Sequence, residues 1–236
     1  MNLRKIIIVF ILFFAIKSLS AQTSNFKFGV KGGLNLSTAI VSEGDSKFKQ
    51  GYHIGGTVDY LLTSKFELQS GLFFSKTGSI IHDLGISGYR GINLSMEEYE
   101  RLRPLYTNTF NTLYLKLPLH VAYRKNLSDN FNIYTGFGLY FGYGIGGKSK
   151  KKSHYGGWYD YDLEKGPIFF NEFKWDTFDG NLSRFDFGAG VNAGVEFHKF
   201  VLGAGFEYGK NIDTFQTRSE YQYRNVNISI STGYRF

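Results

Sequence analysis

The sequence contains no cysteine and only three prolines among its 236 residues. The lack of cysteine excludes disulfide bonds, thiolate metal sites, a cysteine nucleophile and the lipid-acceptor cysteine of a lipoprotein. Beyond the N-terminal segment there is no apolar run long enough to cross a membrane as a helix. Aromatic residues and glycine are abundant instead, with 24 Phe, 17 Tyr and 29 Gly. This composition favours strands and tight turns, and the length suits one barrel or one ordinary domain.

The first 21 residues have the features of a secretory signal peptide. Arg4 and Lys5 form a positive start, residues 6–16 are an unbroken apolar stretch, and small residues follow near the expected cleavage site. An apolar stretch of this length is too short to span a bilayer comfortably, so a membrane anchor is the less favoured alternative. The sequence therefore predicts a signal peptide at 1–21 and one mature domain at 22–236.

The chain is moderately basic, and removal of the signal peptide lowers its formal charge from +7 to +4. The basic residues are not gathered into one helix or stripe, and a secreted chain seldom meets nucleic acid, so no nucleic-acid partner is expected. One local run, residues 148–152, contains four lysines. We interpret it as a solvated loop tip, and contact with anionic polysaccharide or lipopolysaccharide phosphate stays open as the alternative.

Eight segments of the mature sequence alternate apolar and polar residues with the period of a strand. In the cleanest of them, 113–123, a large apolar residue occupies every second position. The eight segments are 26–36, 52–62, 66–75, 113–123, 131–143, 185–197, 200–208 and 226–236. Tilted strands that cross a membrane need about nine to eleven residues, whereas strands in soluble proteins are usually about five or six residues long. The segment lengths therefore favour membrane-spanning strands.

The connections between these segments alternate between short and long. The short ones are 63–65, 124–130 and 198–199, and the long ones are 37–51, 77–112, 144–184 and 209–222. Such sorting is typical of outer-membrane barrels, which have short turns on one side and long loops on the other. The sequence thus predicts an all-β fold, an eight-stranded antiparallel up-and-down transmembrane β-barrel. Short periplasmic turns, long extracellular loops and two periplasmic termini in the cell outer membrane are part of this prediction.

Aromatic residues mark the short-turn end of the outward face. Each segment contributes one of them there: Phe26, Tyr60, Phe66, Tyr123, Phe131, Phe197, Phe200 and Tyr234. An aromatic girdle of this kind is found where outer-membrane barrels pass from lipid into water. The C-terminal Tyr234 and Phe236 are expected to form the signal that the barrel-assembly machinery reads.

The opposite, inward face carries charged and titratable residues of both signs. They are Lys27, Lys31, His53, Asp59, Glu67, Lys116, His120, Asp186, Glu196, Glu207 and Arg235. An eight-stranded barrel is just wide enough for side chains to fill, and buried charges need partners or water. The sequence therefore predicts a polar plug of ion pairs in the lumen. Inward glycines within 136–144, 188–194 and 203–205 are expected to leave room for Lys, Arg and Glu from the other wall.

No catalytic pattern stands out. The sequence lacks a nucleophile elbow, a Ser/His/Asp order and a His-x-x-x-His pair, so no catalytic residue, cofactor or metal site is expected and the protein is interpreted as non-enzymatic. The loop residues His82, Asp83, His154 and Asp160 leave a surface hydrolase open as a less favoured alternative. Three acids within 160–164 are a weak signal for a divalent cation.

Four stretches of the sequence resemble one known family. Phe28–Ser37, Gln69–Ser75, Leu113–Leu119 and Tyr234–Phe236 are similar to the PorT-like outer-membrane protein β-barrel domain family, whose members are often labelled porins. The resemblance extends over essentially the whole mature chain and implies an outer-membrane barrel. The namesake of the family acts in type IX secretion and gliding-associated export, while most members have no assigned role.

The favoured function is a non-enzymatic scaffold, adhesive or secretion-accessory barrel that displays large loops. The expected partners are outer-membrane lipid and lipopolysaccharide, the barrel-assembly machinery, and other envelope or secretion proteins that meet the loops 77–112 and 144–184. A narrow porin-like channel for small solutes or ions is the alternative.

Overall fold

The protein was analysed as a computed structural model that describes residues 25–40, 45–84, 105–155, 169–179, 182–212 and 224–236. Every regular element in these ranges is a strand, and the predicted signal peptide lies outside them. No helix among the described residues is long and apolar enough to cross a membrane. The strands are β1 (Phe26–Ile40), β2 (Asp45–Leu61), β3 (Phe66–Leu84), β4 (Leu105–Ser128), β5 (Phe131–Gly146), β6 (Lys148–Tyr155), β7 (Phe169–Asp176), β8 (Phe185–Phe197), β9 (Phe200–Ile212) and β10 (Arg224–Arg235).

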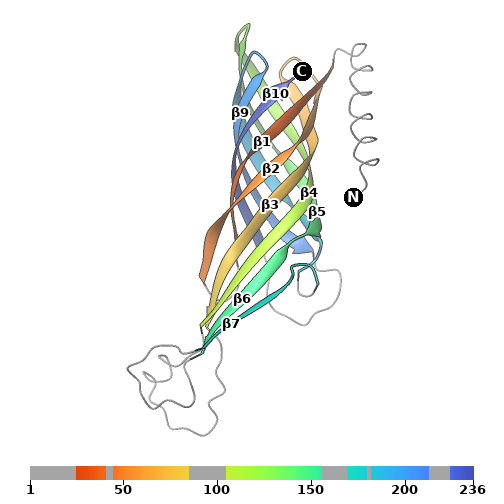
Figure 1. Ribbon diagram of the computed structural model, residues 1–236. Helices are drawn as coiled ribbons and strands as arrows, with labels where there is room; N and C mark the ends of the chain where they lie inside the picture. Colours follow the sequence, from red (N-terminus) through yellow and green to blue (C-terminus); the bar gives the residue numbers. More distant parts are fainter. Residues whose placement is uncertain (1–24, 41–44, 85–104, 156–168, 180–181, 213–223) are drawn as a thin grey trace, which may run out of the picture.

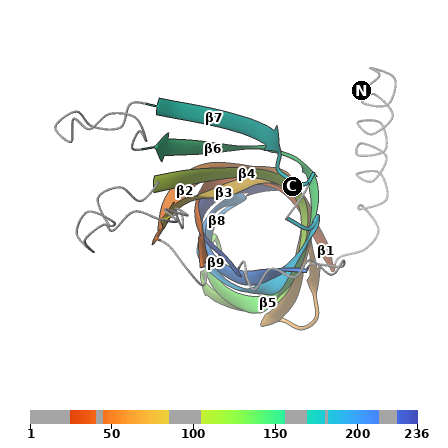
Figure 2. The ribbon, with the colours of Figure 1, turned by 90° about the horizontal axis from the view of Figure 1, so that it is seen from below.

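Eight of these strands form a closed barrel. Their order is β3-β2-β1-β10-β9-β8-β5-β4, and a further pairing between β3 and β4 completes the ring, which Figure 2 shows along its axis. All neighbouring strands are antiparallel. The predicted eight-stranded antiparallel barrel is therefore confirmed.

The short connections lie together at one end of the barrel, which we call the short-turn end. They follow β2, β4 and β8, and the C-terminus and the start of β1 lie at the same end (Figure 1). The first and last strands pair from Gly29 opposite Arg235 to Ile40 opposite Arg224. We call the other end, where β6 and β7 project, the long-connection end.

The strands run further at the long-connection end than the sequence indicated. β3 continues to Leu84 and β4 begins at Leu105, so much of the predicted loop 77–112 is a paired ladder. The backbone pairing continues there, but apolar and polar residues no longer alternate strictly. This part of the ladder lies beyond the apolar outer surface of the barrel, so neither of its faces has to be apolar. The predicted loop boundaries were wrong for this reason.

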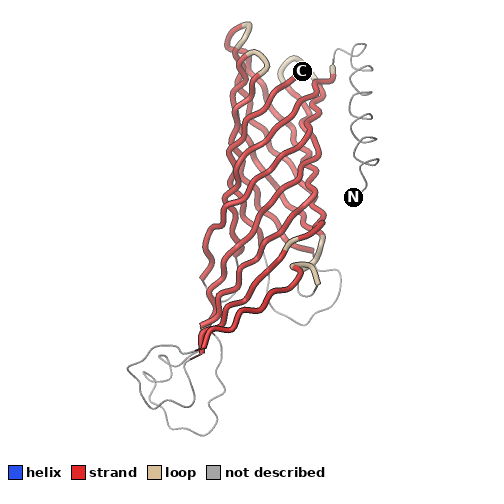
Figure 3. The backbone as a smooth tube through the Cα atoms, in the orientation of Figure 1, coloured by secondary structure: helices blue, strands red, loops and turns tan. Residues whose placement is uncertain are grey.

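The predicted loop 144–184 contains the hairpin of β6 and β7. β5 pairs with β4 up to Gly146, and β6 then takes over the same edge of β4, with Lys150 opposite Thr109. The break lies at Gly147, whose φ is 153°. A Cβ on this glycine would lie 2.1 Å from the carbonyl oxygen of Asn111, so only glycine fits. The hairpin thus pairs with the part of β4 that continues beyond the ring (Figure 3).

The outward surface of the barrel is apolar. Leu34, Phe137 and Ile230 are 72%, 69% and 65% exposed, and many other large apolar side chains are about half exposed. A water-soluble protein rarely exposes so large an apolar surface, whereas a barrel in lipid requires it. This surface is the apolar band of the protein.

Aromatic pairs border the apolar band at both ends. At the short-turn end, Phe26 contacts Tyr60 and Phe66 contacts Tyr123, with ring centroids 4.8 and 5.5 Å apart. Phe200 and Tyr234 lie 5.3 Å apart on the neighbouring strands. Towards the other end, Tyr143 of β5 contacts Phe185 of β8 at 5.3 Å. The residues predicted as a girdle thus pair across adjacent strands.

Candidate functional site

The inward face of the barrel carries a charged network near the short-turn end. It consists of two arginines and three carboxylates, all buried: Arg124, Arg235, Asp59, Glu67 and Glu196. Nη2 of Arg235 lies 2.7 Å from Asp59 and 3.3 Å from Glu67, and Nη1 bonds Glu196. Arg124 lies 2.6 Å from Glu196 and 3.4 Å from Glu67. The network therefore ties together β2, β3, β4, β8 and β10 across the lumen.

Arg124 is the member of this network that the sequence analysis missed. The predicted fourth segment ended at Tyr123, and residues 124–130 were interpreted as a turn. In the structure β4 continues to Ser128, and the backbone N–H of Arg124 donates to Lys65 O at 2.7 Å. Lys116, His120 and Ala122 occupy alternate, inward positions of β4. Extending this series by one step, to position 124, would have identified Arg124 as an inward residue.

Lys27 lies beside the same network. Electrostatic interactions link it to Glu196 and Glu67, but among the described residues no carboxylate lies within ion-pair distance of its amine. The network itself has one carboxylate more than it has arginines. Lys27 therefore offsets its excess negative charge from a longer distance.

A second group of polar side chains lies closer to the long-connection end. The amine of Lys116 lies 2.6 Å from Glu207, which also accepts a 2.9 Å hydrogen bond from Asn227. Asp186 accepts a 2.9 Å hydrogen bond from Asn225. These partners come from β4, β8, β9 and β10, so the lumen is bridged at this level as well.

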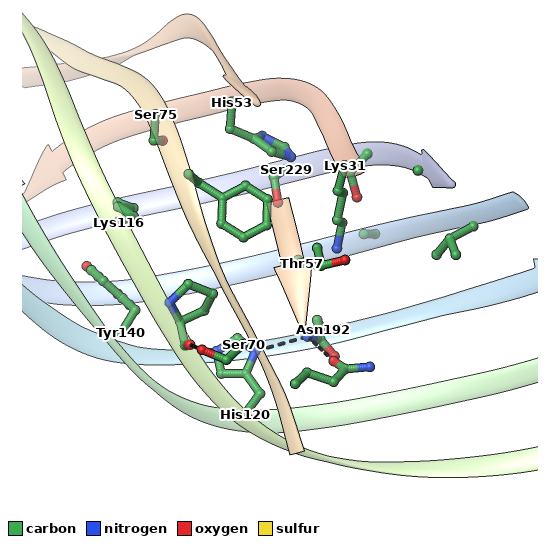
Figure 4. Close-up of a pocket in the computed structure, with 18 of the residues that line it drawn as sticks. Lys31, His53, Thr57, Ser70, Ser75, Lys116, His120, Tyr140, Asn192 and Ser229 are labelled. Carbon is green, nitrogen blue, oxygen red and sulfur yellow. Dashed lines mark hydrogen bonds between the residues drawn. The ribbon is translucent and has the colours of Figure 1, made fainter. Parts of the chain in front are cut away.

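Between the two groups is a cavity of about 130 Å³. Lys31 and His53 point into it from β1 and β2, and His120 and Asn192 face it from β4 and β8 (Figure 4). Nδ1 of His53 lies 2.8 Å from the side-chain Oδ1 of Asn35, and the side-chain amide of Asn192 donates to Nδ1 of His120 at 2.9 Å. The cavity has both polar and apolar lining residues, and it is large enough for several water molecules.

Lys31, like Lys27, lies apart from the direct ion pairs that the described residues form in the lumen. No acidic side chain among the described residues lies within 4.0 Å of its amine, although Asp59 and Glu207 attract it electrostatically. The amine points into the cavity (Figure 4). The cavity thus contains one cation without a direct ion pair.

Several inward glycines make room for tyrosine side chains. A Cβ on Gly194 or Gly203 would lie 2.5 or 2.7 Å from the hydroxyl of Tyr134, and one on Gly209 would lie 2.0 Å from that of Tyr140. At these positions the prediction that the space serves Lys, Arg and Glu is corrected, because the space is taken by tyrosine. Tyr134 in turn places its ring 5.9 Å from the guanidinium of Arg235, so the glycines position the aromatic side chains that flank the charged groups.

An aromatic cap closes the lumen at the long-connection end. Phe178, which follows β7, packs its ring against Tyr114 at 5.7 Å, and both side chains are buried together with Leu182. The guanidinium of Arg184 lies 5.3 Å from the Phe178 ring and donates to the carbonyl oxygen of Gly144 at 3.0 Å. The segment between β7 and β8 therefore folds back over the lumen.

Gly144→Val is expected to displace this cap, because a Cβ at this position would lie 2.3 Å from Cζ of Phe178. Overpacking of this kind costs about 1–3 kcal/mol, measured as the free energy of unfolding in detergent micelles. Gly146→Val is the matched control, since nothing lies within 4 Å of a Cβ there. The double variant Gly144→Val/Phe178→Ala should be destabilised by less than the sum of the two single variants. If the two losses of unfolding free energy were strictly additive, the proposed clash between position 144 and the Phe178 ring would be contradicted.

The loop candidates do not form a site in the described part of the chain. His82 lies on β3, where its Nδ1 is 3.2 Å from Oγ1 of Thr107. Asp160 and the acids of 160–164 lie outside the described residues, and the side chains of Asp83 and His154 are not described. No group of three or more His, Cys, Asp or Glu in the described ranges could hold a metal ion.

The chain is similar to one protein family and to several solved structures. The family described as outer membrane protein beta-barrel domain matches residues 20–211. Among solved structures, the attachment invasion locus protein Ail of Yersinia pestis is 16% identical, with 90% of this chain and 99% of Ail covered and a TM-score of 0.40. OprG of Pseudomonas aeruginosa is 11% identical over 90% of this chain and 96% of that chain, with a TM-score of 0.43. Neisserial surface protein A is 13% identical over 89% and 97%, with a TM-score of 0.40.

The curated proteins contain no match to this chain. The family match spans most of the barrel strands, and it does not confirm the PorT-like label. The protein therefore belongs to the outer membrane protein beta-barrel domain family and is an integral β-barrel of the outer membrane.

Proposed function

We propose that the protein is a non-enzymatic platform of the outer membrane, with a scaffold, adhesive or secretion-accessory role. The observation that carries this proposal is the charged network of Arg124 and Arg235, which bridges the lumen at one end. The Phe178 cap and the Lys116–Glu207 pair fill the lumen towards the other end. A barrel filled in this way serves better as a rigid support than as a diffusion pore.

The long-connection end faces outwards from the cell in this proposal, and both termini face the periplasm. Barrels of this class place their short turns in the periplasm and their longer loops outside. The extension formed by β4, β6 and β7 would then project from the cell surface (Figure 1). Phe173 on β7 is 66% exposed and stacks with Trp175 at 5.8 Å, which offers an aromatic contact for an envelope or secretion partner. The resemblance to PorT-like proteins supports the secretion-accessory form of the role.

The second candidate is a narrow channel for small solutes or ions. It is favoured by the cavity of about 130 Å³ and by Lys31, whose amine has no direct ion pair there. A path through this cavity would have to pass Arg235 on one side and Phe178 on the other.

Conductance in planar bilayers of phosphocholine lipids distinguishes the two. We expect the wild-type protein to give no steady openings, because side chains bridge the lumen at several levels. Arg124→Ser/Glu196→Ser removes one cation and one anion together, and should raise conductance above the wild type. Steady wild-type openings would favour the channel and reject the filled lumen.

A further inference from the structure

Seven lysines share the outward face of the sheet just beyond the apolar band. The register of the strands places them together. Thr109 of β4 is opposite Ile80 of β3 on one side and Lys150 of β6 on the other. Ile80 is in turn opposite Lys47 of β2, and Lys150 is opposite Lys174 of β7. Directly opposed residues on antiparallel strands point to the same side. The outward lysine patch consists of Lys47, Lys49, Lys76, Lys148, Lys150, Lys152 and Lys174, and all are exposed or half-exposed.

The face that carries the patch continues the lipid-facing surface. Lys76 is opposite the outward residues Tyr52 and Leu113, and the β3–β4 register runs unshifted from Leu113 to Thr109. The amine of Lys76 lies 5.8 Å from the centre of the Tyr52 ring, at the border of the apolar band. A ligand on this face would therefore lie beside the barrel, where the membrane is, and not over its mouth.

A bulge in β2 brings Lys49 to this face. The register between β2 and β3 shifts between Phe48 and Tyr52, and a Cβ on Gly78 would lie 3.0 Å from Cδ of Lys49. Lys76 and Lys150 lie close enough to Lys49 for their charges to repel its ammonium group. Three strands thus direct cations towards one region.

The patch has few acidic groups to neutralise it. Among the described residues, its face carries three acids, Asp45, Glu172 and Asp176. A hydrogen bond from Lys174, together with the charges of Lys174, Lys150 and Lys152, holds the pKa of the Glu172 carboxyl below its usual range. Seven lysines against three carboxylates leave a surplus of positive charge on the face.

We propose that the outward lysine patch binds the phosphate groups of lipids in the leaflet beside the long-connection end of the barrel. Ammonium groups form charge-assisted hydrogen bonds with phosphate oxygens. The four residue steps from Lys76 to Ile80 span about 13 Å along β3, or about 10 Å along the membrane normal with the strand tilt of a barrel. That distance is comparable with the polar headgroup layer, which is about 5–8 Å thick on each side of the hydrocarbon core. The lysines closest to the band therefore lie at the depth of lipid phosphates.

The test titrates the full chain in neutral detergent micelles with diphosphoryl lipid A and counts bound lipid by native mass spectrometry. Lys76→Gln/Lys150→Gln/Lys174→Gln should weaken binding on the order of 100-fold, at about fivefold for each lysine near an anionic surface. The matched control is Lys65→Gln/Lys125→Gln/Lys199→Gln, which removes the same charge from exposed positions at the short-turn end. The lipid A affinity of this control variant should stay within twofold of that of the wild type. The heat-induced mobility shift on gels verifies that each variant is folded.

Single changes on β6 test the face itself. Lys150 and Lys151 are neighbours in sequence but lie on opposite faces, since Lys150 is opposite Lys174 and Lys151 is opposite Phe173. Lys150→Gln should weaken binding about fivefold and Lys151→Gln should not.

Equal losses in the patch and control variants, equal binding of dephosphorylated lipid A, or competition by inorganic phosphate at the concentration of the lipid would each overturn the proposal. The proposal rests on the membrane position of the barrel and not on its role as a platform, so conductance results do not affect it.

Discussion

Arg235→Met is expected to lower the free energy of unfolding by about 3–5 kcal/mol, the usual result when one partner of a buried ionic network is removed. Arg235 contacts Asp59, Glu67 and Glu196, and all three carboxylates are buried. Without it, Arg124 would be the one cation left in direct ion pairs with this network, and it contacts Glu67 and Glu196 but not Asp59 in the described structure. The measurement is unfolding by urea of the protein refolded into phosphocholine vesicles, followed by tryptophan fluorescence.

Arg224→Met is the matched control, because it makes the same chemical change on the same strand. Arg224 is exposed, and its guanidinium donates to the hydroxyl of Tyr208 at 3.0 Å. The expected loss is about 0.5 kcal/mol or less. Arg235→Met/Glu196→Gln should recover part of the stability, because it also removes one uncompensated carboxylate. Equal losses in the two arginine variants would show that the network does not stabilise the barrel.

Alternation in the sequence was sufficient to predict the strand faces of the barrel. β8 has the same bounds as its predicted segment, and Lys116, Glu67 and Glu196 all lie inward, as their parity indicated. The period of a strand is two residues, so a single apolar face determines the orientation of every side chain along it. The fold class was predictable because lipid on one side makes this pattern strict.

The partners within the lumen could not be predicted from the same pattern. Parity places Arg235 and Glu67 on inward faces, but it does not show that they meet across 168 positions of sequence. Which inward residues lie level with each other depends on strand tilt and stagger, which are properties of the closed barrel. The contacts of Tyr134 with Gly194 and Gly203 were missed for the same reason.

The pairing of β6 and β7 with the end of β4 could not be predicted from the sequence for a different reason. Outside the membrane neither face needs to be apolar, and Lys150, Lys152 and Lys174 occupy strand positions that would be apolar in the band. The run of lysines was therefore interpreted as a loop tip. Backbone pairing with β4 makes it a strand, and only pairing shows that alternate lysines lie on one face.

Phe137→Arg is expected to destabilise the barrel by about 2–4 kcal/mol, the cost of a basic residue near the bilayer midplane on the lipid face of a barrel. Phe137 is 69% exposed and lies midway along β5, between Phe131 at the short-turn girdle and Tyr143 towards the other end. In a water-soluble protein, so exposed a position would accept arginine with a change within about 0.5 kcal/mol. The size of the loss therefore reports contact with lipid, measured by the same urea titration in vesicles.

Phe173→Arg provides the matched control, since Phe173 is almost equally exposed, at 66%, but belongs to the hairpin beyond the barrel wall. It can lose its stacking with Trp175, which is worth about 0.5–1.5 kcal/mol, but no charge has to enter lipid. A loss at Phe137 that clearly exceeds the loss at Phe173 would place the apolar band in the membrane and the hairpin outside it. Equal losses at the two positions would mean that lipid covers both or neither, and would contradict the position of the hairpin outside the membrane.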